Sequence, residues 1–531
     1  MKYGLYFLLL LCEMPQLYSQ GSFSGGLQLN AYFYDRDSLI GASGTPHYDN
    51  LKSSTDAWLN LDYTNDRYLF DSGIRLDVFT SSNLHNPGVP YSAIGIGNFY
   101  IRKRGEKYKI TGGYFYDQFG SGIVFRAYED RTLGIDNSIL GIHLEAEPVE
   151  QLKVKAFTGV HKNRLSLFKP VIIGMNVESH LSGGEKVRLI PGASIVKRTL
   201  DDASMDFVVS TIETYDPEDR FVPKYNVYVF GAYTTLTAGD FSWYVEGAGK
   251  TTEAIVDATA MLVNSPGNVI YTTLNYSRPQ LGMALQFKRT ENFPFRTSPK
   301  ETLLDGVINF IPPVTRQNSL RLPARYNAAV QDLEELAYSA DVNYSPVAKK
   351  ITLNFNYAEV RDFDHDLKFR EAIGDVELKF KKEWKGMAGL QFIQYNQLFY
   401  EKEVYGNYAL VKAFAPFAEF TWKVNKKHSF TFDAQAQFTD EDFGSWLYGA
   451  VEYNIAPWFS IAASDMYNYQ PNPERMDDKI HYYQFFTSFT YRQHVLTLAY
   501  AKQVAGIVCT GGVCRYEPAF SGVKLTLNSS F

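Results

Sequence analysis

The densest group of side chains that could do chemistry lies between Phe119 and Asn137. It holds two cations and two carboxylates within six residues: Arg126, Glu129, Asp130 and Arg131. Opposite charges this close together can form charge-assisted hydrogen bonds and hold a loop in one conformation. Two glycines, Gly120 and Gly122, permit a close backbone approach or a positive φ. No helix pattern follows them, so a phosphate-binding loop is a poor interpretation.

Catalytic chemistry has weaker support. The nine histidines are scattered along the chain, and none lies in a Ser or Cys nucleophile motif. The run Asp364-His365-Asp366 could bind a metal or act as a base, but a solvated loop is the simpler interpretation. The sequence therefore predicts no catalytic, metal-binding or cofactor-binding residue and no enzyme. A hydrolytic pair assembled from distant strands stays open as an alternative.

Cysteine usage and the N-terminus both point to export. Residues 1–20 read as a secretory signal peptide, with Lys2 before an apolar run and small or polar residues near its end. Removing this segment removes Cys12 and leaves Cys509 and Cys514 in the loop C-T-G-G-V-C. In an oxidising compartment we expect these two to form a disulfide. A metal site would need further Cys or His nearby.

The elements that must position such groups are strands. The last ten residues alternate between an apolar and a polar face, with Val523, Leu525, Leu527 and Phe531 against Lys524, Thr526, Asn528 and Ser530. A final strand that ends on an aromatic residue resembles the C-terminal strand of bacterial outer-membrane barrels. That resemblance implies that Phe531 is a signal for the barrel-assembly machinery.

Composition agrees with a membrane barrel. There are 38 Tyr and 38 Phe, yet the mean hydropathy is only −0.23. Barrels place aromatic residues in girdles at both membrane interfaces. No stretch after residue 20 approaches the apolar length of a transmembrane helix. The net charge of −6 argues against a nucleic-acid partner.

The pattern of the final strand recurs from Ser22 onward, with short turns and longer loops alternating between the segments. We predict one large antiparallel transmembrane barrel over residues 21–531, with about 24 strands (range about 20 to 26). The turns and both termini would be periplasmic and the long loops extracellular, in the outer membrane of a Gram-negative cell. Charged residues on the inner face, such as Asp71, Arg75 and Asp77, would meet water in a wide lumen.

Two loops stand out within this barrel. Apolar residues in the Phe119–Asn137 segment need a surface to pack on, so we predict a loop folded into or over the lumen. A further pair of strands or a solvated loop stay open as alternatives. The longest loop, Glu291–Leu333, is rich in aromatic residues, Pro and Arg. Loops of this length are usually functional or disordered, and we predict lumen closure or partner binding.

One motif carries a more specific resemblance. The run F-G-S-G…F-R-A-Y-E-D-R…L-G-I-D-N, together with the signal peptide and Phe531, resembles a family of uncharacterised Bacteroidota outer-membrane barrels. The resemblance spans the mature chain. It implies the barrel fold and the outer membrane, and it implies no catalytic residue.

Three functions follow from this reasoning. The first is a non-enzymatic subunit of an outer-membrane complex for assembly, secretion or uptake, because a wide barrel without a plug domain needs something to fill or cover it. The second is a solute channel or porin constricted by its loops, and the weakest is an outer-membrane hydrolase. Expected partners are outer-membrane lipid, lipopolysaccharide, the barrel-assembly machinery and a protein in the same membrane. No cofactor is expected.

Overall fold

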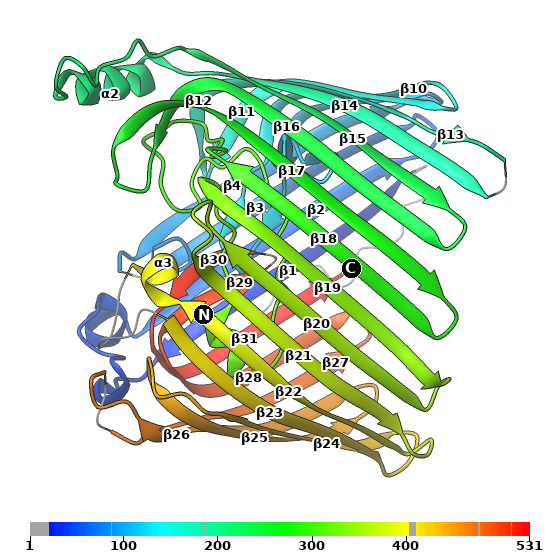
Figure 1. Ribbon diagram of the computed structural model, residues 1–531, viewed down its shortest axis with the longest axis vertical. Coiled ribbons are helices and arrows are strands. Elements are labelled where there is room, and N and C mark those ends of the chain that lie inside the picture. Colours follow the sequence, from blue (N-terminus) through cyan, green and yellow to red (C-terminus); the bar gives the residue numbers. More distant parts are fainter. Residues whose placement is uncertain (1–20, 87, 185, 403–409, 476–477, 511) are drawn as a thin grey trace.

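A computed structural model describes residues 21–531 apart from 87, 185, 403–409, 476–477, 511 and the side chains of 507–510. The predicted signal peptide, residues 1–20, lies outside the described residues. The described chain forms a closed antiparallel barrel of 24 strands, which confirms the predicted fold class and strand number. Every barrel strand pairs with the next barrel strand along the chain, and β1 pairs with β31 to close the ring (Figure 1).

The barrel strands have these bounds: β1 Ser22–Tyr34, β2 Ser53–Asn65, β3 Phe70–Ser82, β4 Tyr91–Arg104, β5 Tyr108–Phe115, β10 Ile139–Val149, β11 Leu152–Asn163, β12 Ser166–Ser179, β14 Val187–Thr199, β15 Asn226–Ala238, β16 Phe241–Val256, β17 Leu262–Arg278, β18 Leu281–Glu291, β19 Glu334–Val347, β20 Ile351–Arg361, β21 Leu367–Lys379, β22 Trp384–Asn396, β23 Leu410–Lys423, β24 His428–Gln437, β25 Gly444–Ile455, β26 Phe459–Pro471, β27 His481–Tyr491, β28 His494–Gln503 and β31 Phe520–Ser530. The two-residue strand β13 (Leu181–Ser182) continues the edge of β12 along β14.

The first and the final strands pair and close the barrel. Its register runs from Gly26 opposite Ser530 to Tyr34 opposite Gly522. Beyond it, Phe531 N donates to Gly25 O at 3.0 Å, and Gly25 N donates to Phe531 O at 2.8 Å. The last residue therefore extends the ladder that closes the barrel.

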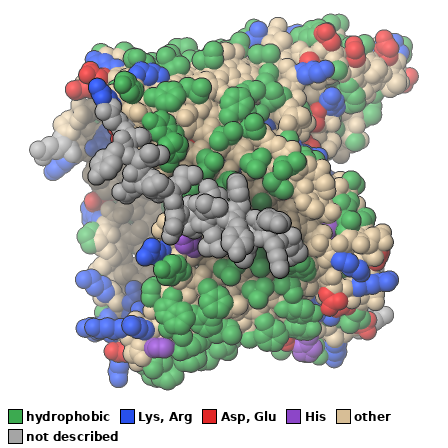
Figure 2. All heavy atoms as spheres, turned by 180° about the vertical axis from the view of Figure 1, so that it is seen from behind, with side chains coloured by type: hydrophobic (Ala, Val, Ile, Leu, Met, Phe, Trp, Pro, Cys, Tyr) green, Lys and Arg blue, Asp and Glu red, His purple; other side chains and the backbone are tan. Residues whose placement is uncertain are grey.

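Alternation along each strand separates an outer from an inner face. On β3, Ile74 is 46% exposed on the outside, whereas its neighbour Arg75 is 3% exposed on the inside. Figure 2 shows hydrophobic side chains spread over the outer wall, with charged side chains gathered toward its two ends. An apolar outer wall on a closed barrel suits a lipid environment, because closure leaves no strand edge unpaired. Among the described residues, no helix is long and apolar enough to cross a membrane.

A proline interrupts one ladder without ending its strand. Pro416 lies within β23, which runs through it and keeps Pro416 opposite Leu390 of β22. On the other side, continuous pairing with β24 begins only at Phe417, after an isolated bridge from Phe414 to Phe438. Proline has no backbone N–H to donate, which accounts for the gap on that side alone.

Connections at one end of the barrel are short, and those at the other end are mostly long. Three of the long ones fold inward, and we call residues 116–138, 292–333 and 504–519 the plug. Their elements are β6 (Asp117–Phe119), β7 (Phe125–Ala127), β8 (Glu129–Asp130), β9 (Ile135–Asp136), η4 (Pro323–Tyr326), β29 (Gly506–Thr510) and β30 (Val513–Glu517). Other elements of the long-loop end are the turns η2 (Ser38–Ile40) and η3 (His47–Leu51) and the helices α2 (Asp202–Glu213) and α3 (Gln397–Glu401).

The plug gives the barrel a hydrophobic core inside its lumen. Phe125 of β7 packs on Phe157 of the inner wall with ring centroids 4.4 Å apart. Phe293 and Ile308 of the longest loop are fully buried in the same cluster. The plug is thus held by the apolar packing that stabilises a soluble domain.

This core fills only the long-loop half of the lumen. On β19 the inward residues near the plug are buried: Glu335, Ala337 and Ser339. The inward residues nearer the short turn are not buried: Asp341, Asn343 and Ser345. The same change occurs on β11, where Phe157 and His161 are buried while Lys153 and Lys155 are half-buried. The short-turn half of the lumen is therefore a polar vestibule, in which inward side chains such as those of β19 and β11 keep access to solvent.

Candidate functional site

The segment singled out by its charges, Phe119–Asn137, lies inside the lumen as part of the plug. Gly120 and Gly122 both have positive φ, at 52° and 105°. A Cβ on Gly120 would come within 2.7 Å of the Glu246 carboxylate on the barrel wall. Both glycines therefore have the positive φ and the close packing that the sequence suggested.

The four charged residues of the segment do not simply pair with one another. Arg131 Nε donates to Glu129 Oε1 at 2.5 Å, which is the expected internal pair. Asp130 instead accepts from the backbone N–H groups of the turn that follows it. The Arg126 guanidinium lies between two rings, 4.4 Å from the centroid of Tyr128 and 4.1 Å from that of Phe310. It thereby joins the first plug segment to the second.

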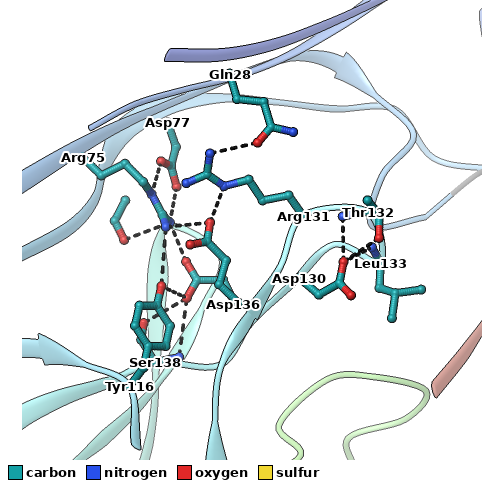
Figure 3. A network of polar contacts seen from close by, with 12 residues as sticks. Gln28, Arg75, Asp77, Tyr116, Asp130, Arg131, Thr132, Leu133, Asp136 and Ser138 are labelled. Carbon is teal, nitrogen blue, oxygen red and sulfur yellow. Dashed lines mark hydrogen bonds and ion pairs between the residues drawn. The ribbon is translucent and has the colours of Figure 1, made fainter. Parts of the chain in front are cut away.

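Glu129 and Asp136 dock the segment on Arg75 of β3 (Figure 3). Arg75 holds Asp77 in a two-pronged contact, with Nε to Oδ1 at 2.6 Å and Nη2 to Oδ2 at 2.9 Å. It also donates to Glu129 Oε1 at 2.9 Å and to Asp136 Oδ2 at 2.5 Å. Such a fork uses the fixed donor geometry of a guanidinium, so it specifies orientation as well as attraction.

Lys162 of β11 completes this network by donating to Asp136, and its Nζ lies 3.8 Å from Asp77. Burial by itself would raise the pKa of Asp136, but the charges of Lys162 and Arg75 outweigh burial and lower this pKa to about 2. Asp136 is thus a carboxylate at neutral pH, and it links two barrel strands to the plug.

The expectation that Asp71, Arg75 and Asp77 meet water is wrong. Arg75 and Asp77 are 3% and 2% exposed because the plug covers them. Asp71 is 8% exposed and pairs with Arg104 at 3.1 Å. The shared face and the i, i+2 spacing of Arg75 and Asp77 were visible in the sequence. The partner of Arg75 in the plug was not visible, because Arg75 and Asp136 are 61 positions apart.

Buried wall cations also hold the longest loop, and the sequence did not reveal this. Arg198 donates to Arg296 O, Lys250 to Pro294 O and Lys288 to Pro312 O, at 3.1, 2.5 and 2.8 Å. Each also pairs with a carboxylate of the wall, either Glu253 or Glu335. At the far side of the loop, Arg325 forms a second fork with Glu401 of α3 at 2.6 and 2.8 Å. Burial lowers the pKa of Arg325, but Asp442 and Glu401 outweigh it, and the net direction is upward.

Between the plug and the β1–β31 wall lies a cavity of about 590 Å³, here named the seam cavity. The wall side consists of inward residues of the two strands: Gln28, Asn30, Tyr32, Tyr34, Lys524, Thr526 and Asn528. The facing side includes Arg131 and Leu133 of the first plug segment, Arg515 and Ala519 of the third, and Tyr48 of η3.

The seam cavity marks the place where the plug leaves the wall uncovered. Gln28 and Asn30 of β1 are half-buried, whereas their cross-strand neighbours on β2, Trp58 and Asp56, are 3% and 1% exposed. On the other side, Lys524 is half-buried opposite a buried Ala499 of β28. Access to solvent in the long-loop half thus follows the closing strands. A smaller cavity of about 240 Å³ shares Gln503 with it.

Hydrolytic chemistry gains little from this geometry. His143 Nε2 lies 2.8 Å from Asp117 Oδ2 in the lumen. The other side chain that pairs with Asp117 is Lys155, which is not a Ser or Cys nucleophile. His481 and Asp465 pair on the outer wall at 2.6 Å. In the part of the chain that the structure describes, no group of three His, Cys, Asp or Glu is arranged to hold a metal. Asp364-His365-Asp366 lies in the β20–β21 turn, where His365 has a positive φ of 65°.

A family model matches the whole chain, residues 1–531. The chain belongs to DUF6029, a family of unknown function. No curated protein sequence matches this DUF6029 chain. The resemblance to Bacteroidota barrels is therefore still an expectation.

Solved structures similar to the DUF6029 barrel are other large barrels. A chain of the P pilus tip assembly intermediate PapC-PapD-PapK-PapG from E. coli is 10% identical with a TM-score of 0.51; the match covers 98% of this chain and 62% of that one. The P pilus usher PapC translocation pore is 8% identical, with a TM-score of 0.49 and coverages of 96% and 99%. The siderophore receptor PirA from Pseudomonas aeruginosa is 6% identical, with a TM-score of 0.42 and coverages of 96% and 80%. At these identities the similarity concerns the fold.

Proposed function

We propose that this barrel is an outer-membrane channel for small polar solutes, closed over most of its width by the plug and passable along the β1–β31 wall. The observation that carries the proposal is the seam cavity of about 590 Å³, which is lined by polar side chains. Elsewhere in the long-loop half, the plug packs against buried inward side chains, as on β19.

The two halves of the lumen suit such a path. The vestibule is polar and reaches the short-turn end, so a solute there stays hydrated. Passage through the long-loop half then depends on a narrow route instead of a wide pore. Porins combine these features when a loop folds into the lumen, which makes selectivity a property of the lining side chains.

The same proposal includes location and orientation. The apolar outer wall favours a lipid environment, and the resemblance of the final strand favours the outer membrane. Short turns are periplasmic in barrels of this kind, which would put both termini in the periplasm. Contacts with lipopolysaccharide, outer-membrane lipid and the barrel-assembly machinery follow from that location. The absence of catalytic function stays a prediction.

Planar-bilayer conductance of the purified protein tests the channel. We expect a small, steady conductance from the intact chain and a much larger one after residues 119–137 or 292–333 are deleted. Deleting the rim segment 203–221, which is outside the plug, should leave the conductance unchanged. A barrel that is silent both before and after the plug deletions would refute the proposal.

A complex subunit is the second candidate, although its original motivation has changed. The barrel is filled by its own loops, so no partner is needed to fill it. What favours a partner is apolar exposure at the long-loop end, where Val222 and Leu303 are each 83% exposed. Purification in mild detergent should then yield a stoichiometric partner that is lost when Val222 and Leu303 are changed to Ser. A clean monomer in both cases would contradict this candidate.

A further inference from the structure

The seam cavity contains an unusual balance of charge. Its lining includes three cations, Arg131, Arg515 and Lys524, and one carboxylate, Glu517. The cations come from three separate parts of the fold: the β8–β9 hairpin, β30 and the wall strand β31. A partly desolvated group of like charges is costly unless an opposite charge joins it.

Lys524 is the least compensated of the three. Its Nζ donates to the neutral Gln503 Oε1 at 3.1 Å and lies 4.4 Å from the ring centroid of Phe520. None of the ion pairs formed among the described residues involves Lys524. Two neutral contacts leave its positive charge available inside the cavity.

The other two cations are partly used but still face the cavity. Arg515 pairs with Glu517 and donates to Leu84 O at 3.0 Å. Arg131 pairs with Glu129, and its Nη1 donates to Gln28 Oε1 at 3.0 Å. Lys524 is near Glu517, but Arg515 already pairs with this carboxylate, so the lining of the cavity carries an excess of positive charge.

The remaining lining favours a hydroxyl-rich molecule. Amides and hydroxyls line the wall and the facing loops: Asn30, Thr45, Asn83, Thr132, Thr526 and Asn528. Each can donate or accept, as a sugar hydroxyl does. An aromatic cluster closes one side, with Tyr34 centred 5.2 Å from Tyr48 and 5.7 Å from Phe520. A volume of about 590 Å³ is in the range of small-molecule sites.

We propose that the seam cavity is a selective binding site for a small, hydroxyl-rich anion, with Lys524, Arg131 and Arg515 as the groups that recognise its charge. The proposal rests on the proposed function, since it names the class of solute that the channel takes. The anion can be a carboxylate, as in a uronic acid, or a phosphate, as in a sugar phosphate. Lysine and arginine bind both, and arginine does so through its planar fork.

Isothermal titration calorimetry on the full chain in detergent tests the site, with D-glucuronate, D-glucose 6-phosphate and neutral D-glucose as the probes. We expect one or both anions to bind at least about tenfold more tightly than glucose at low salt, because a charged hydrogen bond contributes more than a neutral one. The preference should shrink as salt is added. The anion that binds more tightly shows whether the site prefers a carboxylate or a phosphate. Equal binding of all three probes, or binding of none, overturns the proposal.

Matched variants locate the site. Lys524→Gln should weaken anion binding about tenfold and leave glucose binding unaffected. Lys524→Arg keeps the positive charge, so it should bind the anion about as the wild type does. Lys379 is also an inward cation, but it lies at the short-turn end of β21, so Lys379→Gln should bind as the wild type does. Unchanged binding by Lys524→Gln overturns the proposal. If Lys524→Gln does not fold, anion binding by Lys524→Arg and by the wild type, measured as a function of salt, still tests the proposal.

Failure of the site and failure of the channel are distinguishable. If the anions bind but no conductance is seen, the channel proposal is wrong and the binding-site proposal holds. If the barrel conducts and the anions neither bind nor reduce the current, the binding-site proposal is wrong and the channel proposal holds.

Discussion

Replacing Arg75 by Gln is the sharpest perturbation of the plug. The network around Arg75 is balanced in charge, with cations Arg75, Arg131 and Lys162 against carboxylates Asp77, Glu129 and Asp136. Gln keeps much of the length of Arg and removes the charge. Three carboxylates would then share two cations in a site where the Arg75 side chain is only 4% exposed.

The expected magnitude follows from that burial. Breaking a buried ion pair by removing one partner costs about 3–5 kcal/mol, because the remaining charge stays buried without compensation. At about 1.4 kcal/mol per tenfold change, the docked plug should lose a factor of roughly 10² to 10³·⁵ in its equilibrium. The strands themselves keep their backbone ladders, so the cost falls on plug docking and not on barrel closure.

Single-channel recording measures this directly. Arg75→Gln should show frequent large openings that are rare in the wild type, while its electrophoretic migration as a folded barrel is retained. Arg75→Gln combined with Asp77→Asn should recover part of the closure, since the second change removes the stranded charge. Arg104→Gln is the control, because Arg104 is 33% exposed and pairs at the short-turn end with Asp66 and Asp71, neither of which is in the plug.

A quiet Arg75→Gln channel with wild-type thermal stability would refute the reasoning. It would mean that apolar packing alone holds the plug and that the charged network contributes nothing measurable. Equal effects from Arg75→Gln and Arg104→Gln would refute it as well, because the argument depends on burial and on contact with the plug.

Three further predictions concern closure, acid and redox state. Gly25→Val should impair assembly of the heat-stable barrel seen in electrophoresis, because a Cβ at Gly25 would meet the Phe531 ring at 2.4 Å. The pKa of Asp136 is lowered to about 2, so its contribution to plug stability, about 2 kcal/mol, is complete above roughly pH 4 and is lost as pH falls toward 2; channel openings should increase over that window. Cys509 lies opposite Cys514 in the β29–β30 register, so alkylation should label neither without reductant and both after reduction.

Each of these has its own control or contrary outcome. Gly26→Ala should assemble normally, since the nearest atom to its Cβ would be Ser529 O at 3.7 Å. Channel openings that stay constant from pH 5 to pH 2 would contradict the role given to Asp136. Thiols that react before reduction would show that Cys509 and Cys514 are free. The side chain of Cys509 lies outside the described residues.

Much of the fold was predictable because strand alternation is local. Each strand carries its own inner and outer face in a repeat of two residues, and the contrast between Ile74 and Arg75 needs no distant information. The contents of the lumen were less accessible. Phe119–Asn137 could be recognised as a segment that needs a surface, but two other interpretations stayed open. The third plug segment, residues 504–519, was not recognised, since its sequence signal was only a short cysteine loop.

The sequence by itself determined that the chain forms a closed barrel of about this size, with its final strand paired to its first. That follows from backbone hydrogen bonding and alternation, which act over neighbouring residues. Only the tertiary structure decided what the barrel encloses. The plug partners of Arg75, Glu129 and Asp136, are 54 and 61 positions away in the sequence. The local sequence pattern of a charged residue on a strand is the same whether water or a plug will face that residue. The plug, the buried network and the seam cavity are consequences of that folding.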